Sequence, residues 1–208
     1  ISNNYIVATG SNNGTDPTGD SLLPYNSVAV KVKGNTSIRN NRIESTGIGI
    51  NLVKEGAVTI ENNIIDVNNF GAVESYAIYS EIKFTGNTTG AVVNNAIFVT
   101  GDDDKQKAAK NIVVKNNTFD IKLPSVAVGY DPDTWASTVM SEGIVFYYCE
   151  NVTFTDNRVN LKYNNVNGYY DTLYVVSVKS DAYNYDMDDD YNMIYNIVSS
   201  NVLISNNT

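Results

Sequence analysis

Residues 38–65 read IRNNRIESTGIGINLVKEGAVTIENNII, and this stretch decides the fold. It begins and ends on the same motif, in which an apolar residue precedes a polar residue, a pair of Asn and a further strand. Between the two copies, residues 48–52 (IGINL) and 56–60 (GAVTI) alternate apolar with small or polar side chains. Such alternation is typical of a β-strand with one buried face. The stretch predicts three short strands in the 22 residues from Asn41 to Asn63, without a helix.

The same motif recurs along the whole chain. The two residues that form the Asn pair are nearly constant. The second of them is Asn in all seven copies, and the first is Asn in six copies and Asp in one. A repeat of this kind indicates a solenoid whose successive coils pair strand on strand. We therefore predict an all-β fold, a right-handed single-stranded parallel β-helix of about six to seven coils with loop insertions. The second Asn residues of the motifs are Asn4, Asn41, Asn63, Asn95, Asn117, Asn157 and Asn207.

These seven Asn residues are predicted to face the interior of the coil. Asn63, for example, shares its parity with Ile65 and Val67, which belong to the buried face of the next strand. A side-chain amide both donates and accepts, so stacked copies can bond to the backbone and to one another along the axis. Without such partners, a buried polar group costs about 1–3 kcal/mol. The seven residues are thus interpreted as a structural ladder, not as a binding site.

Length and composition fit one elongated domain. With 42% hydrophobic residues, the 208 residues are expected to form a single β-helix domain over residues 1–208. The net charge of −9 argues against nucleic acid, because phosphates attract Lys and Arg. Its one cysteine, Cys149, excludes an intrachain disulfide. No apolar run approaches the roughly 18 residues of a membrane span. Because Ile1 and Thr208 both lie within motifs, we expect a segment of a longer array.

Insertions between the motifs are the first place to look for function, because they project from the regular coil. Their Tyr and Trp residues lie outside the core, and rigid rings with a polar tip suit contact surfaces. We therefore predict that they bind a cell-surface glycan or a surface protein. The expected insertions are residues 10–27, 68–75, 122–141, 163–172 and 180–200. The candidate binding residues are Tyr130, Trp135, Tyr183, Tyr185, Tyr191 and Tyr195.

Two acidic clusters are candidate calcium sites, and no other cofactor is implied. The first cluster is the Asp triplet at residues 102–104. If the unit ending at Asn117 is aligned with the unit ending at Asn63, this triplet occupies the position of residues 48–52, which are predicted to form a buried strand. Unpaired buried charges are too costly, so the coil is expected to open there, with residues 101–110 looping out. That loop is either simply solvated or a notch that holds a cation or a sugar. The second cluster is at residues 186–190. It lacks the Gly and the Glu of a helix–loop–helix calcium loop, so any calcium site there would have another geometry. The candidate ligands are Asp102, Asp103, Asp104, Asp186, Asp188 and Asp190.

The I-x-N-N-x-I corner, followed by a G-I-x-I strand at residues 47–50, resembles the parallel β-helix repeat of pectate-lyase-like proteins and of large surface proteins. The density of Asn, Thr, Tyr and Val, with only three Arg, is most similar to adhesin-like surface proteins of methanogenic archaea. This resemblance implies an extracellular location at the cell surface. It also implies a rigid stalk with binding loops, stacked on possible further repeats of the same chain.

A carbohydrate-active β-helix enzyme and a ligand-free structural spacer are the alternatives. The chain has no His, which removes imidazole acid–base chemistry and His-ligated metals. Asp102-Asp103 resembles the paired Asp of polygalacturonase-like enzymes, but the accompanying Gly-His-Gly is missing. None of the three Arg residues lies in the Arg-x-Pro-x-x-Arg strand of pectate lyases. We expect no catalysis here, since a polysaccharide lyase or hydrolase would need catalytic residues outside this chain.

Overall fold

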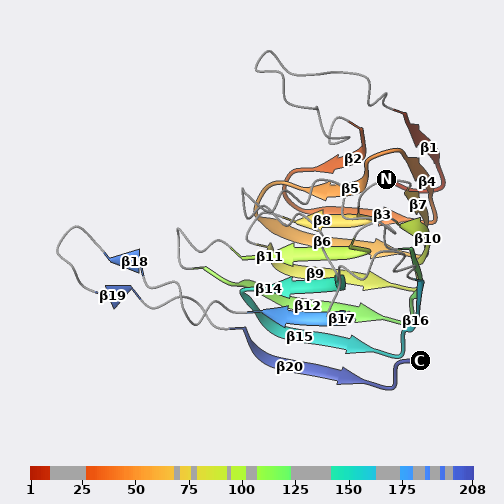
Figure 1. Ribbon diagram of the computed structural model, residues 1–208. Coiled ribbons are helices and arrows are strands. Elements are labelled where there is room, and N and C mark those ends of the chain that lie inside the picture. Colours follow the sequence, from red (N-terminus) through yellow and green to blue (C-terminus); the bar gives the residue numbers. More distant parts are fainter. Residues whose placement is uncertain are drawn as a thin grey trace, which may run out of the picture.

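Three parallel β-sheets contain most of the described residues (Figure 1). The computed structural model describes residues 1–9, 27–67, 71–75, 79–92, 95–101, 107–122, 142–162, 174–179, 186–187, 193–194 and 199–208. Over these residues the chain forms strands and connections, and none of them lies in a helix, so no helix of the described chain could cross a membrane. Each of the three sheets has six strands.

The three sheets are numbered here by the order in which the chain first enters them. Sheet I contains β1 (Tyr5–Ala8), β4 (Arg42–Ser45), β7 (Ile64–Val67), β10 (Thr88–Val92), β13 (Thr118–Lys122) and β16 (Arg158–Lys162). Sheet II contains β2 (Val28–Val32), β5 (Ile48–Leu52), β8 (Val73–Ser75), β11 (Ile97–Thr100), β14 (Glu142–Tyr147) and β17 (Tyr174–Lys179). Sheet III contains β3 (Thr36–Arg39), β6 (Gly56–Glu61), β9 (Tyr79–Thr85), β12 (Ala109–Lys115), β15 (Cys149–Thr155) and β20 (Ser200–Ser205).

The chain visits sheets I, II and III in turn and then returns to sheet I, one layer further along. Each strand of these sheets therefore pairs in parallel with the equivalent strand of the next coil. The strand numbers of such a pair differ by three, except for β15 and β20. This is the topology of a parallel β-helix, and it confirms the predicted solenoid. Six strands in each sheet correspond to six coils, the lower bound of the expected number.

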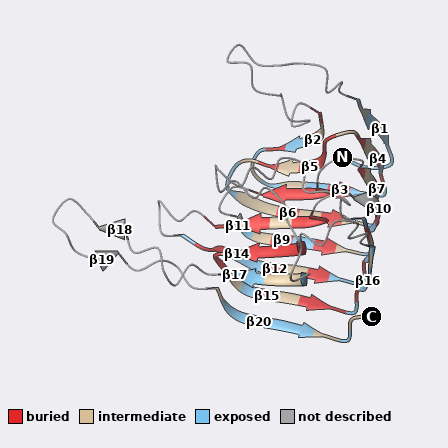
Figure 2. Cartoon of the chain, in the orientation of Figure 1, coloured by how far each residue is buried: buried red, intermediate tan, exposed pale blue. Residues whose placement is uncertain are grey.

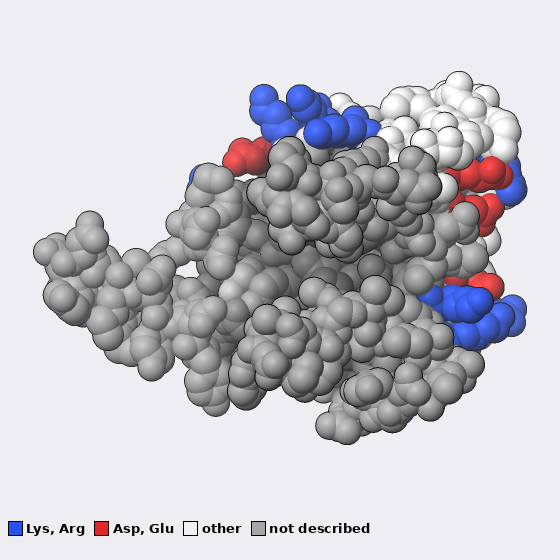
Figure 3. Space-filling view, turned by 45° about the horizontal axis from the view of Figure 1, so that its top comes forward, with Lys and Arg blue, Asp and Glu red and all other residues white. Residues whose placement is uncertain are grey.

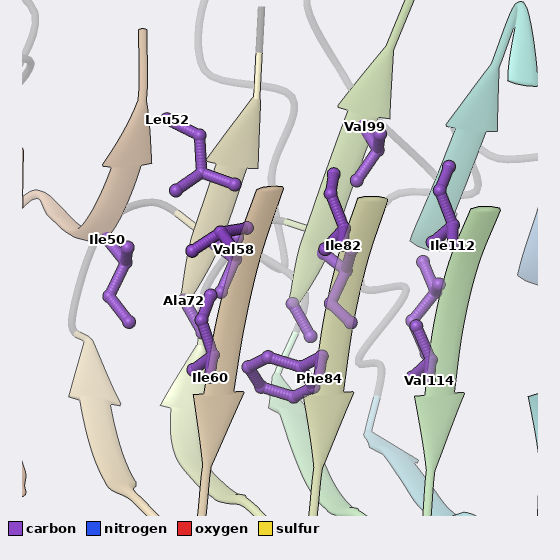
Figure 4. Packing of buried hydrophobic residues seen from close by; sticks show 14 of the residues in the cluster. Ile50, Leu52, Val58, Ile60, Ala72, Ile82, Phe84, Val99, Ile112 and Val114 are labelled. Atoms are coloured by element: carbon purple, nitrogen blue, oxygen red, sulfur yellow. The ribbon is translucent and has the colours of Figure 1, made fainter. Parts of the chain in front are cut away.

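Inward-facing aliphatic and aromatic side chains fill the coil (Figure 4). Residues in register form columns along the axis, such as Ile60, Phe84, Val114 and Phe154 on successive strands of sheet III. Phe119 of sheet I lies between two of them, with ring centroids 5.9 Å from Phe84 and 6.2 Å from Phe154. The predicted alternation of residues 48–52 is confirmed, because Ile48, Ile50 and Leu52 are all buried.

Burial is unequal along the axis (Figure 2). The inward-facing residues of the first coils, including Val30, Val32 and Ile38, are buried. Those of the last coil are not, since Val202 and Ile204 of β20 are 37% and 49% exposed. The hydrophobic core is therefore closed through the middle coils, whereas Ile1 at one end and the last coil at the other are exposed.

Candidate functional site

The corner between sheets III and I is the same in every coil. It always consists of two residues, namely 40–41, 62–63, 86–87, 116–117 and 156–157, and the motifs at residues 3–4 and 206–207 add a copy at each end. The second residue is an Asn whose side chain is part of one continuous ladder. In the middle of this ladder, Oδ1 of Asn63 accepts from the backbone N–H and from Nδ2 of Asn41, both at 2.9 Å. Nδ2 of Asn63 in turn donates to Oδ1 of Asn87 at 3.0 Å.

The ladder contains Asn4, Asn41, Asn63, Asn87, Asn117, Asn157 and Asn207. The prediction of Asn95 as a member was wrong, because Asn95 lies at the corner between sheets I and II. There its Nδ2 donates to the carbonyl of Glu142 at 2.6 Å. The sequence around Asn95 contains the Asn pair of the motif but does not form the corner between sheets III and I. In this coil that corner lies within residues 84–88, which read FTGNT and lack the Asn pair.

The backbone conformation of the first corner residue explains why Asn recurs there. It also explains why a search for the Asn pair misses the corner at residues 86–87. The first residue adopts a left-handed conformation in each coil, with φ of 54° at Asn40 and 55° at Asn62. Asn, Asp and Gly tolerate positive φ better than other residues. Gly86, with φ of 65°, therefore replaces the first Asn without any change of geometry. A search that accepted Asn, Asp or Gly at this position would have found Asn87.

The other two corners vary in length, and they border sheet II on both sides. Between sheets I and II the connections are residues 9–27, 46–47, 68–72, 93–96, 123–141 and 163–173. Between sheets II and III they are residues 33–35, 53–55, 76–78, 101–108, Tyr148 alone, and 180–199. All five predicted insertions thus fall at corners of sheet II. The second begins as predicted but is shorter, because Val73–Ser75 forms β8.

The Asp triplet at residues 102–104 does not take the place of a buried strand. The expected opening of the coil came from aligning Asn95 with Asn41, which placed the triplet over β5, whereas the strand equivalent to β5 in this coil is β11. Residues 102–106 instead belong to the connection from β11 to β12, and β12 already begins at Ala109. The loop predicted over residues 101–110 is therefore shorter than expected. Asp102, Asp103 and Asp104 themselves lie outside the described residues.

Of the predicted contact and calcium-binding residues, Asp186 alone is among those that the structure describes. Tyr130, Trp135, Tyr183, Tyr185, Tyr191, Tyr195, Asp188 and Asp190 lie outside the described residues. Asp186 begins β18 (Asp186–Met187), which pairs antiparallel with β19 (Met193–Ile194). Figure 1 places this hairpin to one side of the three sheets, and it is hydrogen-bonded to none of them. Among the residues that the structure does describe, no three acidic or Cys side chains converge to hold a metal ion.

The outer face of sheet II is the described surface that both variable corners border. One residue per strand lies in register across it and alternates with core residues: Lys31, Asn51, Glu74, Phe98, Val145 and Ser177. This set is called the sheet II row below. Although the row faces away from the hydrophobic core, Glu74 and Val145 are buried, and Phe98 is half-buried. Among the described residues, no donor reaches Oδ1 of Asn51, a buried acceptor next to Glu74. Such a group is unusual in a folded protein and points to a missing donor.

The outer face of sheet I differs, because its charges neutralise one another. Arg42 donates to Glu44 at 2.8 Å and to Asp66 at 3.1 Å, and Tyr5 donates its hydroxyl to Glu44 at 2.9 Å. The hydrogen bond from Arg42 is the main reason that the pKa of Glu44 is lowered. Figure 3 shows Lys and Arg next to Asp and Glu along one side of the molecule. Exposed pairs of this kind satisfy each other and leave no concentrated charge for a ligand.

Sheet III carries a second Asn ladder that the motif did not reveal. Asn111, Asn151 and Asn201 have φ between 53° and 59°, and their exposed side chains stack on successive coils. Asn201 donates to Asn151, and Asn151 to Asn111, both at 3.1 Å. The signal in the sequence is a polar residue followed by Asn and an aliphatic residue, at Lys110, Glu150 and Ser200. These amides bond mostly to each other, so they too belong to the scaffold.

Comparisons with known proteins yield no relative for this chain. No protein-family model matches it, and no curated protein and no solved structure matches it either. The parallel β-helix is therefore established by the sheet topology alone. The functional argument rests on the contrast between the constant corner and the variable corners.

Proposed function

We propose that this protein is an adhesin-like surface protein: a rigid β-helical stalk that binds a cell-surface glycan through the insertions beside sheet II. The observation that carries the proposal is the position of the insertions. All of them fall at the two corners that border sheet II, and none falls at the Asn corner. A scaffold that tolerates extra residues on one side only presents them together, as binding loops on a rigid frame usually are.

The chemistry of the sheet II row supports a polar, uncharged ligand. Asn51, Glu74 and Phe98 lie on adjacent strands, which are about 4.8 Å apart in a β-sheet. An amide, a carboxylate and an aromatic ring at this spacing can contact the hydroxyl groups and the apolar face of a sugar. Oδ1 of Asn51 is buried and has no donor among the described residues, so a ligand hydroxyl would have to enter the row to satisfy it. The tyrosines of residues 180–199 would add further contacts under this proposal.

An extracellular location is part of the proposal. It rests on the resemblance of the composition to adhesin-like proteins of methanogenic archaea. A protein on the partner surface, instead of a glycan, is the alternative outcome of the binding experiment.

The proposal is tested with a glycan array and a variant that loses one insertion. Residues 180–198 are replaced by Val-Lys-Glu, the connection that joins β5 to β6 at residues 53–55. Ser199 is kept, because its hydroxyl donates to the carbonyl of Lys179 and accepts from the N–H of Cys149. We expect the natural chain to bind a subset of glycans and the variant to lose most of that binding. Equal binding by both would contradict a role for this insertion.

A point variant tests the sheet II row separately. Asn51→Ala removes the unpaired acceptor from the row, and Thr59→Ala changes an outward residue of sheet III as a matched control. We expect weaker glycan binding for Asn51→Ala only. If no glycan binds the natural chain, the spacer alternative gains support. Release of new sugar ends from acidic polysaccharides would instead indicate an enzyme, which the absence of His argues against.

A further inference from the structure

Six Asn-x-Ser/Thr sequences occur in the chain, and each is a potential acceptor of an N-linked sugar. They begin at Asn13, Asn35, Asn87, Asn116, Asn151 and Asn206. The first of them lies outside the described residues. A sugar chain is bulky and must lie at the surface of the folded protein, so burial decides which of the other five the fold can accommodate.

The direction of the side chains separates two of these motifs. Residues two apart on a strand point to the same side of the sheet. Asn87 and Thr89 both point inward, where they are 1% and 0% exposed. Asn116 and Thr118 instead lie on the outside of the next Asn corner, and both are exposed. The same acceptor motif is thus closed in one coil and open in the next.

The surroundings of Asn116 leave room for an attached group. Asn116 is the first residue of its corner, with φ of 55°, and therefore stands outside the ladder. Within the described part of the chain, its side chain has no hydrogen bond. The equivalent corner residue of the preceding coil is Gly86, which has no side chain, and that of the following coil is Asp156, whose carboxylate lies 3.5 Å from Nζ of Lys115. A group on Nδ2 of Asn116 would therefore displace no hydrogen bond of the described structure.

The remaining described motifs are less free or repeat the same corner. Asn151 is exposed, but its Nδ2 already donates to the neighbouring Asn of the second ladder at 3.1 Å. Asn35 accepts from the N–H of Ala57 through Oδ1 at 2.8 Å, which holds its amide against the next coil. Asn206 repeats the Asn-Asn-Thr corner and is expected to behave as Asn116 does.

We propose that Asn116 is an N-glycosylation site. The inference rests on the extracellular location in the proposed function, because the transfer accompanies export. The co-reactant is an oligosaccharide carried by a lipid phosphate. Nδ2 of Asn116 gives up one proton and forms a bond to the anomeric carbon of this sugar. The bond from that carbon to the phosphate oxygen breaks, and the lipid phosphate leaves with the electron pair.

The position of the sugar fits the division of the coil into a constant and a variable side. Asn116 lies at the corner between sheets III and I, the one corner that does not border sheet II. An oligosaccharide attached there would add hydrated bulk beside the Asn ladder. It would leave the insertions beside sheet II free for binding.

Peptide mapping of the protein from the cells that produce it tests the site. Trypsin cleaves after Lys and Arg, so Asn116 falls in the peptide 116–122 and Asn87 in the peptide 84–105. We expect the first peptide to carry the added mass of an oligosaccharide and the second to have its unmodified mass. A peptide 116–122 without sugar in the exported protein would overturn the proposal, as would a sugar on Asn87 in the folded protein.

Two threonine variants show whether the added mass depends on the motif. Thr118→Ala removes the hydroxyl of the motif and should abolish the added mass at residues 116–122. Thr88→Ala is the matched control, because Thr88 lies in register with Thr118 and its replacement leaves the motifs at Asn87 and Asn116 intact. The control should retain the full added mass. Equal loss in both variants would contradict attachment at Asn116.

A gained site tests the geometry of the corner. Ile64 is 43% exposed, and Ile64→Thr creates an Asn-Asn-Thr corner at Asn62, which is exposed and has φ of 55° as Asn116 does. We expect a new sugar on the tryptic peptide 55–83 of this variant and none in the control Ile64→Val. An unmodified peptide in both would contradict the argument from corner geometry.

Protease treatment of intact cells separates this inference from the proposed function. Cleavage of the protein from outside shows that it is exported, whether or not it carries a sugar. A protein that stays inside the cell would overturn both the proposed function and the glycosylation. An exported protein whose peptide 116–122 is unmodified would overturn the glycosylation alone.

Discussion

The Asn corner and the corners of sheet II have the same structural task but differ in how much their length varies. Each must turn the chain from one sheet to the next and satisfy the backbone groups that the turn leaves unpaired. The Asn corner does so with two residues in every coil, one in a left-handed conformation and one in the ladder. The corners of sheet II range from the single residue Tyr148 to the connection at residues 180–199. Regularity on one side is thus combined with variation on the other.

The difference teaches where this fold can accept new residues. Each internal Asn of the ladder bonds to the coils on both sides, so an extra residue at one of these corners would break contacts in three coils. At the corners of sheet II, the described residues are linked to the neighbouring coils by backbone hydrogen bonds, for example from Gly101 to Tyr147 and from Tyr148 to Lys179. Extra residues there cost only the modest entropy of closing a longer loop. Function is therefore expected beside sheet II, and stability at the Asn corner.

The largest effect is expected at the centre of the ladder. Asn63→Ala removes the acceptor of two donors of Asn41 and the donor to Ile38, Glu61 and Asn87. Several buried groups lose their partners at about 1–3 kcal/mol each, so we expect the free energy of unfolding to fall by about 4 kcal/mol. Urea unfolding followed by circular dichroism measures this change.

Asn95→Ala is the control for this prediction at a corner of sheet II. Asn95 is also buried, but within the described part of the chain its side chain has one hydrogen bond, to the carbonyl of Glu142. The expected loss is about 1 kcal/mol. A loss as large as that of Asn63→Ala would mean that the ladder is no stronger than an ordinary buried amide.

The second prediction concerns Cys149, where the shortest corner of sheet II meets β15. The thiol is buried against the carbonyls of Val99 and Tyr147, and desolvation raises its pKa from 9.0 to about 12. In the unfolded chain the thiol ionises at a lower pH, so folding stability is unaffected below about pH 9 and falls as pH rises from there toward about 12. At about pH 10.5 this one group should lower the free energy of unfolding by about 2 kcal/mol.

Cys149→Ala isolates that contribution from the ionisation of tyrosines. The variant should be somewhat less stable near neutral pH, because a buried side chain is shortened. Its stability should then decline less steeply than that of the natural chain between about pH 9 and 10.5. Parallel slopes for the two proteins would show that the thiol is not protected when folded. Native Cys149 should likewise resist alkylation near neutral pH, because only the thiolate reacts.

Most of the fold could be predicted from the sequence, and the errors have one cause. Alternation and the Asn corner predicted the strands, the parallel coils and six of the seven ladder residues. The assignment of Asn95 failed because the search demanded an Asn pair, while the backbone demands only a residue that tolerates positive φ. That error also misplaced residues 102–104, since the alignment began from Asn95. The sheet II row could not be found, because β8, a strand of three residues, brings Glu74 beside Asn51 and Phe98 only through the register of the sheet.

The third prediction tests the positive φ directly. Asn62→Ala forces a residue with a Cβ and no local hydrogen bonding into φ of 55°, which should cost about 1 kcal/mol, whereas Asn62→Gly should be nearly neutral. Gly86→Ala should cost more, about 2 kcal/mol, because its new Cβ would also collide with Oδ1 of Asn62. Thermal unfolding of the three variants measures these changes.

The double variant Asn62→Ala, Gly86→Ala sharpens this test. The Oδ1 of Asn62 that would collide with the new Cβ at residue 86 is absent from the double variant. The double variant should therefore lose less stability than the sum of the losses of the two single variants. Additive losses would show that the collision does not contribute and that only the backbone conformation matters.

The smallest change in stability is expected for the largest change in sequence. The variant in which Val-Lys-Glu replaces residues 180–198 loses the β18–β19 hairpin, which pairs with none of the three sheets. It retains Ser199, whose hydroxyl links the carbonyl of Lys179 to the N–H of Cys149. Loop closure changes slowly with length, so the free energy of unfolding should change by less than about 1 kcal/mol in either direction.

Urea unfolding compares this variant with Asn63→Ala under identical conditions. A single substitution in the ladder should then destabilise the protein several times more than the replacement of a whole insertion. If the insertion variant lost as much stability as Asn63→Ala, residues 180–198 would have to be part of the scaffold. A stable variant that no longer binds glycan would instead separate the two sides of the coil, because the Asn corner would hold the fold while the corners of sheet II supply the contacts.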